Sequence, residues 1–356
     1  MKGIILHGGH GTRLRPLTHT GPKQLLPIAN KPMSQYALED LKNIGITEIA
    51  MIIGDVYPEK VKEYYGDGSN FGVNLTYIFQ DEPKGISHAI KLCKKFIGNS
   101  NFIVYLGDNI LSKDLNDYLT KFESSKSDAM ILLCEVDQPQ RFGVAELDQV
   151  QKGKIKRIIE KPKQPLSNLA VIGIYFLTPK IFDIIDNLKP SWRNELEITD
   201  ALQNLIDSGN KIEYDMVTGW WKDTGTPEDI LDANQVILKN IFSKKNKPNN
   251  NLSEQYDETK IGKETTITND SKLVGPVLIG DRCIIGPSAI IGPNVSVGND
   301  TIIQNCHIEN SIIMNTCNIT SKTKIIDSII SDGSIIENEH SSTRKFLLGE
   351  RSRISL

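Results

Sequence analysis

The sequence predicts an α/β fold followed by a parallel β-helix, and three observations support this. First, short aliphatic runs and one-sided helical patterns alternate through the N-terminal part of the 356 residues, as in a mostly parallel sheet with helices on both faces. Second, a polar, asparagine-rich stretch follows residue 242 and indicates a linker. Third, aliphatic residues next to glycine then recur every six residues, a period typical of a parallel β-helix.

Length and pattern together divide the chain into two domains. We predict a first domain over residues 1–242, a linker over 243–258 and a β-helix domain over 259–356. The repeat is clearest at Ile279-Gly280, Ile285-Gly286, Ile291-Gly292 and Val297-Gly298. The pattern breaks after residue 343, so residues 344–356 are predicted to form a closing cap.

Composition excludes several classes of partner. There are 41 Lys and Arg against 44 Asp and Glu, a net charge of -3, so nothing favours binding to nucleic acid or to a membrane surface. No apolar run approaches the roughly 20 residues of a spanning helix, and the N-terminus lacks a signal-peptide pattern. The five cysteines lack metal-type spacing, which fits free thiols and predicts a cytoplasmic protein.

Hydrophobic periodicity places the elements of the first domain. It predicts strands at 4–6, 48–53, 74–79, 101–106 and 169–177, and helices at 33–43, 58–65, 85–97 and 227–242. The alternation is Rossmann-like, and ligands of such sheets bind beyond the carboxyl ends of the strands. The turns after the first and fourth strands, at Gly8-Gly9 and Gly107-Asp108, are therefore candidate parts of a site.

The first turn has the chemistry of a polyphosphate site. Residues 8–13 read Gly-Gly-His-Gly-Thr-Arg, and glycines let the backbone come close to a ligand while their N–H groups bind anions. Arg13, Arg15 and Lys23 add positive charge. A Walker loop is excluded because Thr12-Arg13 follows Gly11, and a dinucleotide fingerprint because position 14 is Leu. The simpler alternative is a tight turn with solvated basic residues.

The motifs G-G-H-G-T-R-L-R-P, P-K-Q-L-L-P and N-K-P-M within residues 8–33 resemble the sugar-1-phosphate nucleotidylyltransferases. The Lys23 and Lys31 motifs are most similar to those of glucose-1-phosphate thymidylyltransferases. The resemblance covers nearly the whole chain and matches the long form, which implies that the β-helix is left-handed. It also implies site roles for the opening loop: nucleotide binding by Gly8, Gly9, Gly11 and Thr12, and catalysis by Arg13 and Lys23.

Two aspartates are candidate metal ligands. Asp108 follows an apolar strand, where a carboxylate can hold a hard cation or simply begin a turn. Leu106-Gly107-Asp108-Asn109 resembles the metal-binding segment of the family, and Asp223 resembles its second ligand. The alternative for Asp223 is an N-cap of the following helix. The resemblance implies Mg²⁺ as the cofactor.

The resemblance also implies where base and sugar bind. Gln80 and Gly85 match the segment that reads a pyrimidine, whose edge a Gln amide can pair with; a surface loop is the alternative. A second set matches the sugar side, with Lys161 catalytic on the sugar phosphate: Gly143, Glu160, Val171 and Arg193. An ordinary solvated strand edge is the alternative for Glu160-Lys161. Asn194 replaces a glycine that is usual in the family.

The reaction implied is transfer of a nucleotidyl group from dTTP to glucose 1-phosphate. An anionic phosphate needs no general base, which fits the lack of an activated Ser, Cys or His. The sequence leaves open whether the nucleotide is dTTP or UTP, because a methyl group is worth only about 1–3 kcal/mol of binding energy.

Two further alternatives are a bifunctional enzyme that transfers acetyl groups at His307 or His340, and a non-catalytic regulatory subunit. We expect a homo-oligomer, as a trimer through the β-helix or as a dimer or tetramer.

One histidine in the opening stretch departs from the family pattern. His7 ends the first strand, where the family usually has a small residue. We predict a packed, neutral imidazole rather than a catalytic group.

Overall fold

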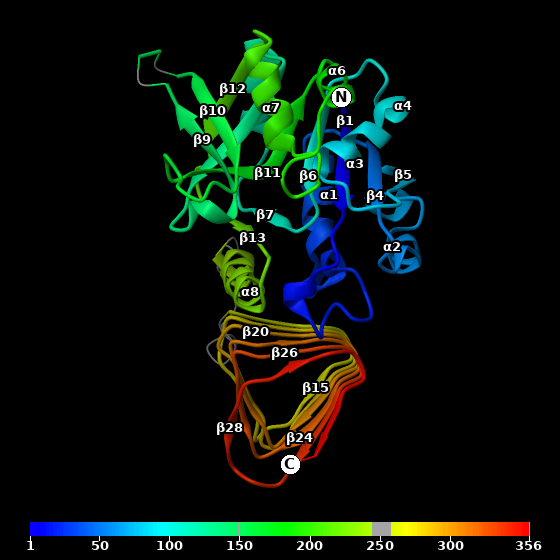
Figure 1. Cartoon of the computed structure of the whole chain (residues 1–356). Helices are drawn as coiled ribbons and strands as arrows, with labels where there is room; N and C mark the ends of the chain where they lie inside the picture. The colour runs from blue at the N-terminus through cyan, green and yellow to red at the C-terminus, as the bar shows by residue number, and fades with distance from the viewer. Residues whose placement is uncertain (149, 152, 244–257, 356) are drawn as a thin grey trace. The chain divides into compact units, whose positions relative to one another are not determined.

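The computed structural model describes residues 1–148, 150–151, 153–243 and 258–355. Their contacts group them into two compact units, which we describe separately. The sheet unit comprises Met1–Gly9 and Ser34–Asp223, and the β-helix unit comprises His10–Met33 and the chain from Thr224 onward (Figure 1). The predicted domain boundaries at 242 and 259 stay a prediction, since residues 244–257 of the predicted linker lie outside the described residues.

The sheet unit contains strands that alternate with helices. Its strands are β1 (Lys2–His7), β4 (Glu48–Ile53), β5 (Asn74–Phe79), β6 (Phe102–Leu106), β7 (Asn109–Leu111), β8 (Ala129–Glu135), β9 (Gly143–Leu147), β10 (Ile155–Glu160), β11 (Leu169–Leu177), β12 (Ile212–Met216) and β13 (Trp221–Asp223). Its helices are α1 (Met33–Asn43), α2 (Pro58–Tyr65), α3 (Ile86–Leu92), α4 (Lys94–Ile97), α5 (Asn116–Ser125), α6 (Ile181–Asp186) and α7 (Ile198–Asp207), with 3₁₀ turns η3 (Ser69–Phe71) and η4 (Pro139–Arg141).

The main sheet is mixed, with a parallel core. Its order is β10-β9-β11-β6-β1-β4-β5, with β8 beside β11 and β12 beside β8. β6, β1, β4 and β5 are parallel to one another. β11 runs antiparallel to β6 and β8. A two-stranded ladder of β13 and β7 lies off this sheet.

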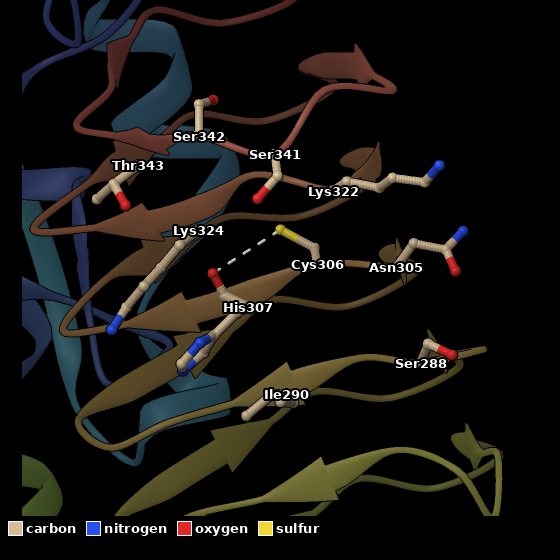
Figure 2. A pocket seen from close by; sticks show the side chains of 10 residues that line it. All are labelled: Ser288, Ile290, Asn305, Cys306, His307, Lys322, Lys324, Ser341, Ser342 and Thr343. Atoms are coloured by element: carbon tan, nitrogen blue, oxygen red, sulfur yellow. Dashed lines mark hydrogen bonds between the residues drawn. The ribbon is translucent and has the colours of Figure 1, made fainter.

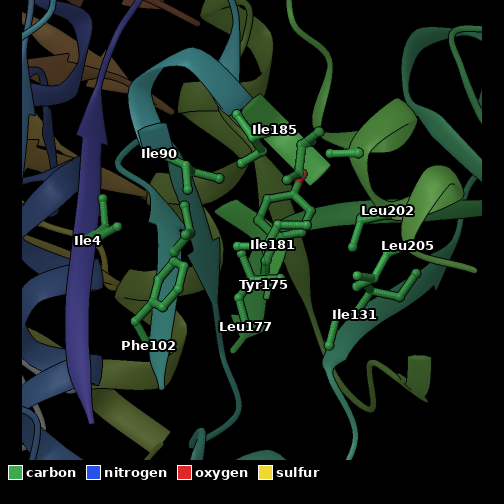
Figure 3. Packing of buried hydrophobic residues seen from close by; sticks show 14 of the residues in the cluster. Ile4, Ile90, Phe102, Ile131, Tyr175, Leu177, Ile181, Ile185, Leu202 and Leu205 are labelled. Atoms are coloured by element: carbon green, nitrogen blue, oxygen red, sulfur yellow. The ribbon is translucent and has the colours of Figure 1, made fainter. Parts of the chain in front are cut away.

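Helices cover both faces of the parallel core, as predicted. Alternate strand residues such as Ile4 and Phe102 pack with buried residues of α3, α6 and α7 (Figure 3). The opposite face meets α1: a Cβ on Gly3 would lie 2.9 Å from Leu41, and the Tyr105 hydroxyl donates to Asp40 Oδ2 at 3.0 Å. Two-sided burial explains the continuously apolar strands.

The periodicity located most elements of this unit. The strands at 48–53, 74–79 and 169–177 and the helices at 33–43 and 58–65 have the predicted bounds. The prediction of a single helix over residues 85–97 is wrong. At Cys93 the backbone forms a tighter, 3₁₀-type hydrogen bond, in which Cys93 N donates to Ile90 O at 2.9 Å. Two short helices, α3 and α4, result, and they keep the apolar residues on one side.

The β-helix unit combines a loop, a long helix and many short strands. The loop holds η1 (Thr12–Leu14), η2 (Lys23–Leu25), β2 (Pro27–Ile28) and β3 (Lys31–Pro32), and α8 spans Pro227–Ser243. The strands of the repeat are β14 (Thr259–Ile261), β15 (Thr266–Ile267), β16 (Lys272–Leu273), β17 (Val277–Ile279), β18 (Ile284–Ile285), β19 (Ile290–Ile291), β20 (Val295–Val297), β21 (Ile302–Gln304), β22 (His307–Glu309), β23 (Ile312–Ile313), β24 (Asn318–Ser321), β25 (Lys324–Ile326), β26 (Ile329–Ile330), β27 (Ile335–Asn338), β28 (Thr343–Arg344), β29 (Leu347–Leu348) and β30 (Arg353–Ser355).

These strands form three parallel sheets, so the predicted left-handed β-helix is confirmed. Their orders are β14-β17-β20-β23-β26-β29, β15-β18-β21-β24-β27-β30 and β16-β19-β22-β25-β28. The aliphatic residue of each repeat stacks on its counterpart in the next coil. Ile285, Ile303, Ile319 and Ile336 make one such column, and all four are fully buried. Each coil therefore buries the next.

The C-terminal segment continues the stack. β28, β29 and β30 pair with the last strands of all three sheets, although the sequence there lacks the repeat. The predicted cap at 344–356 is thus built as a further coil as far as Ser355.

His7 is a packed imidazole, as the sequence predicted. It is 4% exposed, its ring centroid lies 6.0 Å from that of Tyr65, and its ring nitrogens have no hydrogen-bond partner among the described residues. Burial lowers the pKa of His7 to about 3, against a smaller opposing effect of the Asp108 charge. The ring is therefore neutral at pH 7.

This burial predicts a loss of stability in mild acid. Below pH 6.5 the unfolded chain protonates His7, whereas the folded protein does so only near pH 3, so the free energy of unfolding decreases as the pH falls. Between pH 7 and pH 5 the wild type should lose about 2 kcal/mol more than His7→Leu in urea unfolding. His19→Leu, at an exposed histidine, should keep the wild-type pH dependence; an equal pH dependence in all three proteins would contradict the assignment.

Candidate active site

The turn after β1 lies beside the predicted base-reading residue. Gly9 has a φ of 92°, a conformation that glycine adopts without strain. A Cβ on Gly8 would lie 3.8 Å from Gln80 Oε1, so the backbone of the turn and the Gln80 amide are neighbours. The same strand edge therefore presents a glycine turn and an amide that can both donate and accept hydrogen bonds.

Gln80 is held in place by the segment that follows it. It is 7% exposed, its Nε2 lies 3.0 Å from His88 Nδ1, and the same group donates to Gly85 O at 3.4 Å. Gly85 has a φ of 97°, and a Cβ there would lie 2.6 Å from Leu196 O. Only glycine fits this approach, so Gln80 and Gly85 are brought together as the sequence implied.

The two predicted metal ligands occupy neighbouring positions. Gly107 N donates to Leu6 O at 2.9 Å, which ties the end of β6 to that of β1. Asp108 follows, and the next residue, Asn109, is the ladder partner of Asp223. Partners of such a ladder have Cα atoms about 4.5–5.5 Å apart. Both carboxylates thus belong to one small region at the carboxyl end of β6.

Asn109 organises this region, a role the sequence analysis missed. It is 2% exposed, and its Oδ1 accepts from Trp221 Nε1 at 2.8 Å and Gly173 N at 3.2 Å. Its Nδ2 donates to Asp108 Oδ1 at 3.0 Å. One side chain therefore links β7, β11 and β13 and orients Asp108. The only signal was its place next to Asp108.

The carboxylates fit a hard divalent cation. Asp108 and Asp223 supply oxygen donors, and Mg²⁺ commonly takes one or two carboxylates together with substrate phosphates. Among the described residues no group of three or more His, Cys, Asp or Glu side chains is placed to hold a metal alone. Water and substrate phosphate oxygens are the ligands that Mg²⁺ usually takes beside such carboxylates.

The predicted sugar-binding residues converge on Glu160. Its β-ladder partner is Gly143, and a Cβ on Gly143 would lie 3.8 Å from Val171. Glu160 Oε1 lies 3.4 Å from Lys161 Nζ, and its Oε2 accepts from Thr199 Oγ1 at 3.1 Å. Burial raises the pKa of Glu160, and Lys161 opposes this shift.

Arg193 completes this group through three carboxylates. Its Nη1 lies 3.5 Å from Glu160 Oε1 and 3.2 Å from Glu197 Oε1, and its Nη2 lies 2.8 Å from Glu195 Oε1. Glu197 is 4% exposed. Asn194 has a φ of 60°, so asparagine adopts the left-handed conformation that glycine favours. Thr199 and Glu197 were not singled out from the sequence, although they lie within six residues of Arg193.

Arg13 and Lys23, the cations predicted to bind the triphosphate, belong to the β-helix unit. Residues 10–33, which we call the cationic loop, carry Arg13 in η1 and Lys23 in η2. Gly11 has a φ of 58°, and a Cβ there would lie 3.2 Å from that of Lys23. Thr18 Oγ1 donates to Gly11 O at 2.8 Å. The loop is thus compact, and Gly11, Thr12 and Lys23 are neighbours within it.

Arg13 lies against the start of α8. A Cβ on Gly225 would lie 2.9 Å from Arg13 Nη2, so a larger residue would displace the guanidinium group. One residue separates Gly225 from Asp223 in the sequence, and one residue separates Gly11 from Gly9. The predicted site residues therefore fall into groups within the two units, and their assembly into one site stays a prediction.

The β-helix has a separate polar pocket of about 420 Å³ (Figure 2). Ten residues line it: Ser288, Ile290, Asn305, Cys306, His307, Lys322, Lys324, Ser341, Ser342 and Thr343. Glu309 Oε1 lies 2.9 Å from His307 Nε2 and 2.8 Å from Lys324 Nζ, so one carboxylate contacts both of these side chains. We assign no reaction to the pocket, and acetyl transfer at His307 or His340 stays a sequence-based hypothesis.

Among the described residues no helix is long and apolar enough to cross a membrane. The cysteines Cys93, Cys134, Cys283, Cys306 and Cys317 are all free thiols.

Comparison with known proteins gives consistent matches. Residues 2–240 match the family described as nucleotidyl transferase, and residues 273–355 match that described as the GMPPB C-terminal domain. A low-salt glycan biosynthesis nucleotidyltransferase, Agl11, from Haloferax volcanii is 44% identical over 359 residues and covers 100% of both chains. A glucose-1-phosphate thymidylyltransferase from Streptomyces antibioticus is 38% identical over 359 residues, covering 100% of this chain and 99% of its own.

Solved structures agree with these matches. A crystal structure from Bacillus anthracis, described as a glucose-1-phosphate thymidylyltransferase in complex with sucrose, is 45% identical with a TM-score of 0.62. It covers 66% of this chain and 94% of its own. Family model, full-length relatives and fold agree: the chain belongs to the nucleotidyl transferase family, as a sugar-1-phosphate nucleotidyltransferase of the long-form architecture.

Proposed function

We propose that the protein transfers a thymidylyl group from dTTP to glucose 1-phosphate, giving dTDP-glucose and pyrophosphate. The observation that supports this proposal is the ladder of β7 and β13, which pairs Asp223 with Asn109, the residue after Asp108. The name of the Streptomyces antibioticus relative supports this nucleotide and sugar. The name of the Haloferax volcanii relative specifies neither.

The proposed reaction is an in-line displacement. An oxygen of the sugar phosphate attacks the α-phosphorus of the triphosphate, the bond to the β-phosphate oxygen breaks, and pyrophosphate leaves. The attacking oxygen is already anionic at neutral pH, so this chain need only position it and stabilise the developing charge. Mg²⁺ bound by Asp108 and Asp223 would neutralise phosphate oxygens. Arg13 and Lys23 would bind the triphosphate, and Lys161 the attacking phosphate.

Recognition of the two substrates follows from the same residues. Gly8, Gly9, Gly11 and Thr12 would offer backbone and hydroxyl donors to the nucleotide, with Gln80 pairing to the base. Glu160, desolvated and held by Arg193 and Thr199, would accept hydrogen bonds from sugar hydroxyls. Gly143 and Val171 would form the wall beside the ring. A desolvated carboxylate makes strong hydrogen bonds to such hydroxyls.

Cytoplasmic location and a homo-oligomer, as a trimer through the β-helix or as a dimer or tetramer, belong to the same proposal. The five free thiols fit a reducing compartment.

A matrix of substrates tests the proposed reaction. Four nucleoside triphosphates including dTTP and UTP are combined with several sugar 1-phosphates, and pyrophosphate release is measured. We expect the largest kcat/KM with dTTP and glucose 1-phosphate. UTP is the closest competitor, since one methyl group in a pocket discriminates by only about 10–200-fold. A preference for UTP would make the protein a uridylyltransferase, and no release from any pair would favour a regulatory subunit.

The metal assignment predicts that Asp108→Asn loses turnover. The amide keeps the shape of the side chain but removes its charge, so kcat should fall at least about 100-fold, because a metal supplies several kcal/mol of charge stabilisation. Thermal unfolding should stay near that of the wild type. Asp117→Asn, at an exposed residue of α5, is the matched control and should keep full activity. Near-normal turnover by Asp108→Asn would remove the metal assignment.

The sugar assignment predicts a selective effect of Glu160→Gln. The change removes the charged acceptor, and a hydrogen bond to a charged group contributes about 1.5–3 kcal/mol. The KM for glucose 1-phosphate should rise about 10-fold or more, while the KM for dTTP should change less than about 2-fold. Glu146→Gln, on the neighbouring strand β9, should change neither value. An equal rise in both KM values would mean that Glu160 acts on the fold rather than on the sugar.

A further inference from the structure

The cationic loop contains a strained hairpin. β2 and β3 pair antiparallel, with Ile28 opposite Lys31, so Ala29 and Asn30 form a two-residue turn. Both have positive φ, 48° and 61°. Asparagine tolerates this conformation, but for alanine it is strained, because the Cβ atom crowds the backbone. Such strain persists only where the surroundings hold the backbone.

One group that holds this turn is a buried side chain of α8. Asn234 is 1% exposed, and its Oδ1 accepts from Ala29 N at 2.8 Å and from Ser296 Oγ at 3.0 Å. Ala29 belongs to the cationic loop and Ser296 to β20 of the β-helix, beside α8 (Figure 1). One oxygen atom therefore joins three parts of the unit that lie far apart in the sequence.

A second contact fixes the same turn to the same strand. Asn30 Nδ2 donates to Val297 O at 2.6 Å, next to Ser296 on β20. Farther along the stack, a Cβ on Gly349 would lie 3.2 Å from Pro16 O, so another part of the loop touches the terminal coil. The β-helix thus supports the cationic loop at two separate places.

The hairpin is joined to the cations by short links. Lys23 begins η2, and Leu26 N donates to Lys23 O at 3.0 Å immediately before β2. Leu26 O in turn accepts from Met33 N at 3.1 Å, which closes the base of the hairpin. If the turn moved, Lys23 would therefore move with it. Arg13 would move as well, because Gly11 contacts Lys23 and lies two residues before Arg13.

We propose that Asn234 is a positioning residue for nucleotidyl transfer, and that the β-helix is the support on which it holds the cationic loop. The inference rests on the proposed function, in which Arg13 and Lys23 bind the triphosphate. In this proposal the β-helix contributes to catalysis by holding the cationic loop, and it catalyses no second reaction.

The test compares Asn234→Leu with Asn234→Asp, which keeps an accepting oxygen. In Asn234→Leu we expect amide hydrogen exchange over residues 26–33 to quicken about 10-fold, because a buried donor loses its partner. We also expect kcat to fall about 10-fold, with the KM for glucose 1-phosphate changed less than about 2-fold. Asn234→Asp should lie closer to the wild type in both measurements. Asn240→Leu, a similar change on α8, is the control and should affect neither.

A gentler variant keeps the proposal testable if Asn234→Leu fails to fold. Asn30→Gly preserves the left-handed turn, since glycine adopts it freely, but deletes the bond to Val297 O. It should quicken exchange over residues 26–33 and lower kcat, whereas Asn294→Gly, at another left-handed asparagine, should not.

Two results would overturn the proposal: unchanged exchange in these variants, or faster exchange with unchanged kcat. If the wild type releases no pyrophosphate, the proposed function fails, and the role of Asn234 in nucleotidyl transfer fails with it. The exchange measurement still shows in that case whether Asn234 anchors the loop. Failure of the anchor and failure of the reaction are therefore distinguishable.

Discussion

The parallel pairing of β1 with its neighbours is the constraint on which the sheet unit depends. β6 and β4 flank β1 in parallel register, so all three strands end at one edge. The bond from Gly107 N to Leu6 O fixes two of these ends to each other. Because the strands are buried on both faces, the polar groups of the unit's candidate site can gather only beyond them. The glycine turn, Gln80 and Asp108 therefore share one edge.

Local pattern predicted the elements well because each kind of burial leaves its own pattern. Helix 33–43 has the predicted bounds because its buried positions follow the helical period, and strand 48–53 because it is one continuous apolar run. The break at Cys93 was not predictable, because both halves of the segment keep the same apolar spacing. The last coil was predicted only as a closing cap: Leu348 and Ile354 continue two of the aliphatic columns, but Arg344 occupies the third.

The candidate site was only partly predictable from sequence. Motifs identified Asp108 and Glu160, but not Asn109, whose role comes from contacts with Trp221 and Gly173. Likewise, Asn234 has no sequence signal, because its partners Ala29 and Ser296 are remote in the chain. Local sequence records which chemistry is present, whereas the residues that orient it are defined by long-range hydrogen bonds.

The β-helix also has coils of unequal length. The spacing from Ile285 to Ile303 is longer than that from Ile303 to Ile319, yet both pairs are in register. The extra residues must be absorbed at the corners between strands, since the columns leave no room for them. Corners are consequently the places where an engineer could insert a peptide or an epitope without disturbing the neighbouring coils. An insertion within a strand would instead shift every side chain that follows it out of its column.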